Sequence, residues 1–123
     1  SSSAASDVYK RQDFIYAPEI ARANLLAMKS PQTDNVYNVA SGAETSLLQL
    51  WKAMQNVTGA HHLQPTFHPP RRVNAVPRRL ADTTRAARDL GFTATVGLEE
   101  GLRELQMWRR HVLDSLSQKA TPS

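Results

Sequence analysis

The stretch His68–Phe92, with the sequence HPPRRVNAVPRRLADTTRAARDLGF, decides how the rest of the chain is interpreted. It carries two arginine pairs, Arg71-Arg72 and Arg78-Arg79, on a segment braced by prolines. A short helix is expected after the second pair, and Gly91 ends it. Arginine presents a rigid, permanently charged fork of donors that fits two phosphate oxygens at once. The stretch therefore indicates a phosphate-binding loop ahead of a helix, and a solvated basic face is the alternative.

The composition places the chain among ordinary soluble globular proteins. Its 123 residues give room for one domain or part of one, and 41% are hydrophobic while 21% are charged. The net charge of +4 favours an anionic partner without saying which one. The chain has no cysteine, which excludes a disulfide framework and a thiolate metal site. No apolar run approaches the roughly 20 residues of a membrane span, so we expect no membrane partner and a cytoplasmic location.

The first twelve residues, SSSAASDVYKRQ, predict a disordered leader because Ser-Ala-rich segments are low in complexity and solvated. Asp7–Gln12 can be back-translated into a sequence that resembles a transposon end used to build sequencing libraries. We therefore interpret residues 1–12 as a sequencing or cloning artefact, with a native flexible tail as the alternative. Residues 13–116 are expected to form the folded lobe, and residues 117–123 a frayed tail.

Three extended segments and four helices are expected from the pattern of apolar, proline and glycine residues. Aromatic and β-branched runs predict the extended segments, and capping residues, prolines and glycines bound the helices. The extended segments are 13–17, 36–40 and 63–67. The helices run from Pro18 to about Ser30, from a capping box at Ser46 to Thr58, from Thr83 to Leu90 with Asp82 as its cap, and from Gly97 to about Leu116.

In two of these helices, helical spacing places the apolar residues on one face. In the first helix the apolar-leaning face holds Ile20, Ala21, Asn24, Leu25 and Met28. In the last helix the stripe consists of Leu98, Leu102, Leu105, Arg109, Val112 and Leu116, with Trp108 beside it. Each stripe predicts a surface that packs against another element.

The order and spacing of several short motifs resemble one protein family. The run from the first arginine pair through Leu80-Ala81-Asp82 to Leu90-Gly91-Phe92 resembles the C-terminal lobe of NAD-dependent nucleotide-sugar epimerases and dehydratases. These are the extended short-chain dehydrogenase/reductases (extended SDRs). The segment VYNVASGAETSLLQLWKAM, residues 36–54, is similar to the family's Asn-Val-Gly-x-Gly-x-x-x-Ser segment. The resemblance covers about residues 13–111. It implies an α/β fold, namely a C-terminal fragment of an extended SDR Rossmann-type fold with several helices and a few short, partly parallel strands.

The resemblance also implies which residues bind substrate. Arg72 matches the family arginine that grips the nucleotide-sugar diphosphate, and Arg79 falls where the family has a substrate-facing aromatic or polar residue. Phe14 lines the same pocket or packs in the core. Two positions depart from the family: Ala75 replaces an acid that often touches the ribose, and Gln12 replaces an arginine that reaches the diphosphate.

The family's chemistry is hydride exchange at bound NAD, assisted by a Tyr-x-x-x-Lys pair. The 123 residues contain no Tyr-x-x-x-Lys and no GxGxxG turn. We therefore predict no catalytic and no cofactor-binding residue in this chain, and we expect it alone to be inactive. NAD is expected to bind mainly to the N-terminal half of the parent enzyme, which is also expected to form a homodimer. We predict no metal site, because His61, His62 and His68 have no carboxylate or cysteine at ligand spacing.

Three hypotheses for function remain. The first is the substrate-binding portion of a nucleotide-sugar epimerase or dehydratase, which binds the diphosphate of a nucleotide-diphosphate sugar. The second is a catalytically dead interaction domain of the same fold. The third is a small basic nucleic-acid-binding module. Its phosphate contacts would come from Arg71, Arg72, Arg78, Arg79, Arg85 and Arg88. No helix-turn-helix, RRM or OB pattern supports this third hypothesis.

Overall fold

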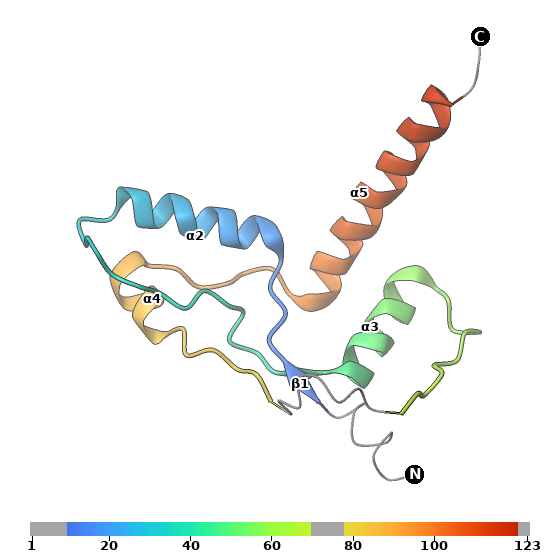
Figure 1. Cartoon of the computed structure of the whole chain (residues 1–123), viewed down its shortest axis with the longest axis horizontal. Helices are drawn as coiled ribbons and strands as arrows, with labels where there is room; N and C mark the ends of the chain where they lie inside the picture. Colours follow the sequence, from blue (N-terminus) through green and yellow to red (C-terminus); the bar gives the residue numbers. More distant parts are fainter. Residues whose placement is uncertain (1–9, 70–77, 121–123) are drawn as a thin grey trace.

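The computed structural model describes residues 10–69 and 78–120. Within them the order of elements is β1 (Arg11–Gln12), α2 (Ala17–Lys29), β2 (Thr45–Ser46), α3 (Leu47–Thr58), α4 (Thr84–Leu90) and α5 (Leu98–Lys119). Figure 1 shows α2 above α4 on one side of the molecule and α3 near β1 on the other, while α5 projects away from both. The predicted α/β class and the expected helices are confirmed.

A small strand pairing joins the start of the described chain to two distant segments. Strand β1 pairs antiparallel with β2, with Arg11 opposite Ser46, and Arg11 also forms a parallel bridge with Arg78. The expectation of short, partly parallel strands is therefore confirmed. The expectation that residues 10–12 are disordered is wrong, because Arg11 and Gln12 form β1. Strand pairing uses backbone N–H and C=O groups, so a low-complexity context does not prevent it. Residues 1–9 lie outside the described residues.

The three extended segments predicted from the sequence form no strands in the structure. Segments 13–17, 36–40 and 63–67 have no hydrogen-bonded ladder among the described residues. A strand needs a neighbouring strand to satisfy its backbone, and aromatic or branched composition alone does not supply one. Side chains of two of these segments pack on the core instead, among them Ile15, Tyr37 and Val39.

The buried core lies where α2 and α4 meet the segment that follows α4. The helices approach each other closely because α2 contributes a small residue, Ala23, and α4 contributes Ala86. Phe92, which follows the end of α4, is the largest fully buried side chain. At Gly91 the backbone has φ of +64°, a left-handed conformation that glycine adopts without strain, so the predicted helix stop is confirmed.

The helix boundaries follow the capping residues closely. The Ser46 hydroxyl accepts a hydrogen bond from the Gln49 N–H at 3.1 Å, and the Gln49 side chain accepts one from the Ser46 N–H at 2.8 Å. The predicted capping box of α3 is thus confirmed. Helix α4 begins at Thr84, one residue later than predicted, and the Asp82 carboxylate accepts a hydrogen bond from the Thr84 N–H at 3.0 Å.

Both predicted apolar helix stripes reach beyond the core. Helix α2 buries Glu19 and Ala23, whereas Leu25 and Met28 on the predicted stripe are exposed, Met28 by 81%. Helix α5 continues to Lys119, so the prediction that residues 117–119 are frayed is wrong. Residues 102–119 contain no glycine or proline, and such a sequence has no intrinsic stop.

Candidate functional site

The arginine segment is described only from its second pair onward. Arg72, the residue that the sequence assigns to the diphosphate, lies outside the described residues, as does Ala75. Arg79 is exposed, and its N–H donates a hydrogen bond to the Arg11 carbonyl at 2.9 Å. The C-terminal end of the arginine segment is therefore bonded to Arg11 of β1, and Arg11 precedes Phe14 by three residues in the sequence.

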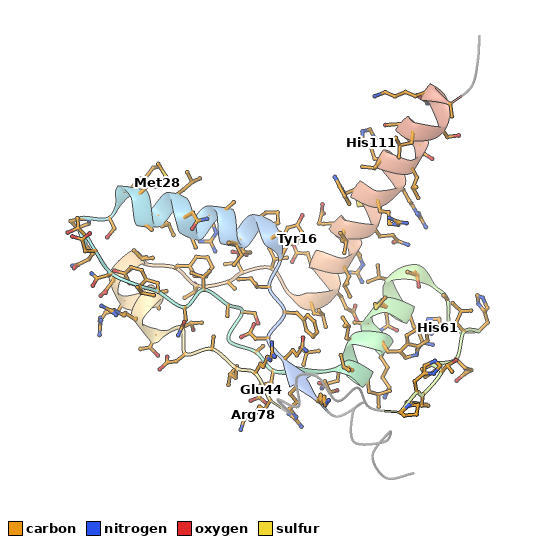
Figure 2. The ribbon with its side chains drawn as sticks, in the orientation of Figure 1. Tyr16, Met28, Glu44, His61, Arg78 and His111 are labelled. Carbon is orange, nitrogen blue, oxygen red and sulfur yellow. The ribbon has the colours of Figure 1, made fainter. Side chains whose placement is uncertain are left out.

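The two arginines of the second pair differ in whether Glu44 gives their side chain a counter-charge. Its carboxylate, only 12% exposed, accepts hydrogen bonds from the guanidinium groups of Arg78 and, at 3.5 Å, of Arg11. Figure 2 shows Glu44 and Arg78 together beside β1. The Arg79 guanidinium has no hydrogen bond or ion pair in the part of the chain that the structure describes. Arg79 is thus available for an anion, whereas Arg78 already has a counter-charge.

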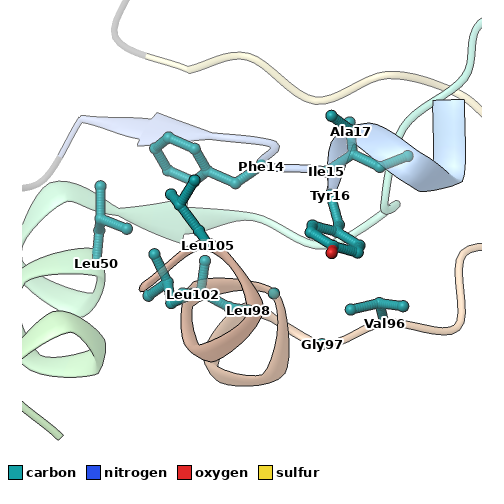
Figure 3. A pocket seen from close by; sticks show the side chains of 11 residues that line it. Phe14, Ile15, Tyr16, Ala17, Leu50, Val96, Gly97, Leu98, Leu102 and Leu105 are labelled. Carbon is teal, nitrogen blue, oxygen red and sulfur yellow. The ribbon is translucent and has the colours of Figure 1, made fainter. Parts of the chain in front are cut away.

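Phe14 borders two adjoining cavities. The larger, about 310 Å³, is almost wholly apolar and is bounded by the first turns of α5, by α3 and by the segment before α2. Figure 3 shows Phe14 beside Leu105 and Leu102, with Tyr16 further along the same wall. The smaller cavity, about 220 Å³, has the hydroxyl-bearing residues Ser41, Thr45 and Thr95 on its lining. Phe14 is half-buried, so it both packs and lines a cavity wall.

Asp13 accepts hydrogen bonds from the turn that contributes Ser41 to the lining of the smaller cavity. Asp13 Oδ1 accepts hydrogen bonds from the N–H of Ser41 at 2.8 Å and from the Ser41 hydroxyl, and Oδ2 accepts one from the Gly42 N–H at 2.9 Å. Gly42 has φ of +78°, which an L-residue rarely adopts. The turn after residue 40 is therefore fixed to the residue that follows β1. In the sequence, Asp13 is only the first residue of the expected extended segment 13–17, and no local pattern marks this role.

Glu19 on α2 binds the segment at Thr95 and Val96, and Val96 lines both cavities. Its Oε1 accepts hydrogen bonds from the N–H and hydroxyl of Thr95 and from the Val96 N–H, each at 3.0 Å. Its Oε2 accepts hydrogen bonds from the guanidinium of Arg22, which also donates to the Thr93 carbonyl at 2.6 Å. The Thr95 N–H, followed by Arg22, lowers the pKa of Glu19 from 4.5 to about 2. Glu19 is 3% exposed, and its position on a helix that starts with proline was the only sequence signal for it.

Several arginines of the nucleic-acid hypothesis already have carboxylate partners. Arg88 and Arg85 both lie near Asp89, at 2.8 Å and 3.8 Å, and Arg78 pairs with Glu44. The pKa of Asp89 is lowered, chiefly by its hydrogen bond with Arg88. Arg71 and Arg72 lie outside the described residues. These pairs reduce the positive charge that a polyanion would meet on this face.

The described residues show neither a metal-binding cluster nor a membrane helix. No three His, Cys, Asp or Glu side chains in the described ranges converge on one point. His61 lies in the loop after α3, and His111 lies far away on the projecting part of α5 (Figure 2). Among the described helices, none combines the length and apolar character needed to cross a bilayer.

Comparison with known proteins identifies relatives over most of this chain. No family model matches it. The chain is 33% identical over 91 residues to the UDP-glucose 4-epimerase of Mycolicibacterium smegmatis, which covers 74% of this chain and 28% of that protein. The crystal structure of UDP-glucose 4-epimerase from Thermotoga maritima with UDP-glucose is 34% identical, with a TM-score of 0.79 over 87% of this chain and 34% of that one. A Bordetella bronchiseptica enzyme in complex with NAD⁺ and UDP is 28% identical, with a TM-score of 0.72 over 91% of this chain and 32% of that one.

The fold similarity shows that this chain has the fold of part of an extended SDR epimerase. Over most of its length the chain is related to UDP-glucose 4-epimerases and related NAD-dependent epimerases, as the motifs around Arg72 and Leu90 predicted. It spans about a third or less of the length of these relatives.

Proposed function

We propose that this chain is the substrate-binding portion of an NAD-dependent nucleotide-sugar epimerase or dehydratase similar to UDP-glucose 4-epimerase. One observation carries the proposal: Arg79, an exposed arginine whose guanidinium has no partner among the described residues, is bonded through its N–H to Arg11 of β1, three residues before Phe14, which lines both cavities. The chain is also 34% identical to a UDP-glucose 4-epimerase whose crystal structure contains UDP-glucose. The ligand in this proposal is the diphosphate of a nucleotide-diphosphate sugar.

The proposed roles follow from charge and shape. Arg79 and Arg72 bind phosphate oxygens. Two guanidinium groups bind a diphosphate more tightly than one, because each makes charge-assisted hydrogen bonds. Phe14 supplies an apolar wall beside the phosphate-binding arginines. Glu44 supplies a counter-charge to Arg78 and Arg11, whereas the Arg79 guanidinium has none among the described residues. The role of Arg72 rests on the sequence motif alone.

The catalytic residues and the NAD-binding residues in this proposal lie outside the 123 residues. NAD, when bound to the parent enzyme, accepts and returns a hydride. No residue of this chain is assigned to that transfer, because the sequence contains neither a Tyr-x-x-x-Lys pair nor a glycine-rich dinucleotide turn. The contribution of this chain is to hold the sugar nucleotide by its diphosphate.

Replacing Arg79 with alanine is expected to weaken UDP binding to the chain about 10- to 100-fold, since a charge-assisted hydrogen bond contributes about 1.5–3 kcal/mol. Arg72→Ala is expected to have an effect of similar size. Titration calorimetry with UDP measures the affinity of both variants. Uridine lacks the phosphates, so its affinity for the unchanged chain should be no higher than the affinity of UDP for the variants. Lys52→Ala is a matched control, because it removes one exposed positive charge on α3. Equal binding of UDP and uridine, or an unchanged affinity in Arg79→Ala, would contradict the proposal.

The DNA upstream of the codon for Asp13 provides an independent test. We expect an open frame there that encodes a glycine-rich strand–turn–helix followed by a Tyr-x-x-x-Lys pair. Such a frame would supply the dinucleotide site and the base that the family's chemistry requires. Sequencing of the source DNA measures this directly. A frame that encodes neither motif would contradict the epimerase proposal and favour a small binding module.

A further inference from the structure

Glu44 lies where three segments of the chain meet beside β1. It directly precedes β2, and β2 pairs with β1. Its carboxylate forms ion pairs with Arg78, at the end of the arginine segment, and with Arg11 of β1 at 3.5 Å. Figure 2 shows Glu44 and Arg78 at this junction. One carboxylate therefore links the arginine segment to both strands of the small sheet.

The backbone on either side of Glu44 is fixed. Before it, the N–H groups of Ser41 and Gly42 donate to the Asp13 carboxylate at 2.8 Å and 2.9 Å. After it, β2 pairs with β1. A side chain on a backbone that is held at both ends keeps its direction, and only 12% of the Glu44 side chain is exposed. Glu44 is thus an acceptor with a fixed position, unlike a carboxylate at the end of a mobile surface side chain.

The arginine segment is attached to β1 less extensively than β2 is. Its contact with β1 is an isolated bridge between Arg78 and Arg11, and the Arg79 N–H donates to the Arg11 carbonyl at 2.9 Å. An isolated bridge restrains a segment less than a ladder does, because it lacks the neighbouring hydrogen bonds that fix the direction of a strand. The ion pair between Arg78 and Glu44 adds a second attachment at the same point. The two attachments together determine how the segment is oriented on β1.

We propose that Glu44 is a positioning residue for the diphosphate: by binding Arg78, it orients the neighbouring Arg79 guanidinium toward the ligand. The inference rests on the proposed function, which assigns Arg79 to the diphosphate. Adjacent residues of a strand-like segment place their side chains on opposite faces, so Arg78 and Arg79 point in different directions. Because Arg78 is turned toward Glu44, Arg79 is turned away from this carboxylate. Among the described residues the Arg79 guanidinium accordingly has no counter-charge.

Charge alone and positioning predict opposite effects of the same substitution. A negative charge near a diphosphate weakens its binding, so a Glu44 that acted only through its charge would make Glu44→Gln bind UDP more tightly. A positioning role predicts that Glu44→Gln binds UDP about fivefold more weakly, which is at the upper end of the contribution of an ion pair with exposed arginines. Orthophosphate needs no particular orientation of the arginine segment. It should therefore bind Glu44→Gln at least as tightly as the unchanged chain.

A double-mutant cycle tests whether Glu44 acts through Arg78. Glu44→Gln should weaken UDP binding in the unchanged chain, but it should have no further effect in Arg78→Met, where the partner is already absent. Titration calorimetry with UDP measures all four affinities, and circular dichroism checks that the helix content is unchanged. Glu104→Gln, which removes an exposed carboxylate on α5, is the control and should bind UDP like the unchanged chain. Unchanged or tighter UDP binding in Glu44→Gln, or an equal loss in both backgrounds, would overturn the proposal.

Amide hydrogen exchange measures the attachment of the arginine segment without any ligand. In Glu44→Gln the Arg79 N–H, which is bonded to the Arg11 carbonyl, should exchange several-fold faster, because the segment has lost its second attachment. The Gly91 N–H, bonded to the Ala87 carbonyl at 3.1 Å, lies at the end of α4 and should exchange at an unchanged rate. Resolved amide signals in heteronuclear NMR spectra report both rates.

The outcomes distinguish this inference from the proposed function. UDP binding that is weakened in Arg79→Ala but not in Glu44→Gln, or an unchanged exchange rate of the Arg79 N–H, would overturn the role of Glu44 alone. Equal binding of UDP and uridine would contradict the proposed function, and the role of Glu44 in diphosphate binding with it. Weaker UDP binding together with faster exchange at Arg79 in Glu44→Gln would support both.

Discussion

Replacing Glu19 with alanine is expected to lower the free energy of unfolding by about 3 kcal/mol, which is a large fraction of the roughly 5–15 kcal/mol typical of a native domain. The substitution leaves the N–H groups of Thr95 and Val96 without their acceptor and removes the counter-charge of Arg22. Buried donors that lose their only partner retain the full cost of desolvation. Thermal unfolding followed by circular dichroism should show a melting temperature lower by about 15 °C. Glu104→Gln, an exposed change on α5, should leave it nearly unchanged.

The stabilisation by Glu19 should depend on pH in one direction. Its pKa is about 2 in the folded chain and 4.5 ordinarily, so its contribution is complete above pH 4.5 and is lost as the pH falls from 4.5 toward 2. The shift corresponds to at most about 3 kcal/mol. Arg22 is 41% exposed, and the nearby solvent screens the pair, so we expect about 1–2 kcal/mol. The difference in stability between the unchanged chain and Glu19→Gln should shrink across this window. A difference that stays constant from pH 6 to pH 2.5 would assign the stabilisation to another group.

The sequence predicted helices better than strands because helix signals are local. Pro18, the capping box at Ser46 and the glycines at the ends of α3 and α4 each act within one helical turn, and each has its predicted role. Strands depend on partners that are distant in the sequence. The segment 36–40 has strand composition but no neighbouring strand among the described residues. Arg11 and Gln12 pair with β2, and Arg11 also bridges to Arg78, so they form a strand despite their context.

The candidate site was predicted in part for the same reason. Arg79 and Phe14 came from the order of motifs, and the structure fixes Arg79 beside β1 and places Phe14 on two cavity walls. The carboxylates that organise the site were missed. Glu44 meets Arg78, 34 residues away, and Glu19 meets Thr95, 76 residues away. No local pattern marks an ion pair or a carboxylate–amide contact between such distant residues.

Replacing Asp13 with alanine is expected to destabilise the chain by about 2–3 kcal/mol and to weaken UDP binding with it. The carboxylate accepts three hydrogen bonds from the turn at Ser41 and Gly42, and alanine supplies none. Because Asp13 follows β1 directly and precedes Phe14, release of this turn frees both the cavity wall and the strand to which Arg79 is bonded. Urea unfolding measures the first effect, and UDP titration at a temperature where the variant is folded measures the second.

A series of smaller changes separates the contributions of the individual hydrogen bonds. Ser41→Ala removes the hydroxyl, which donates to Asp13 and accepts from the Ala43 N–H at 3.1 Å, and should cost about 1–2 kcal/mol. The N–H groups of Ser41 and Gly42 keep Asp13 as their acceptor. Asp13→Asn keeps one carbonyl oxygen, so it should fall between Ser41→Ala and Asp13→Ala. If Asp13 acts by positioning, UDP affinity should decrease in the same order as stability. Loss of UDP affinity in Asp13→Asn with unchanged stability would instead mean that the carboxylate contacts the ligand, which would move the sugar nucleotide from the arginines toward the smaller cavity.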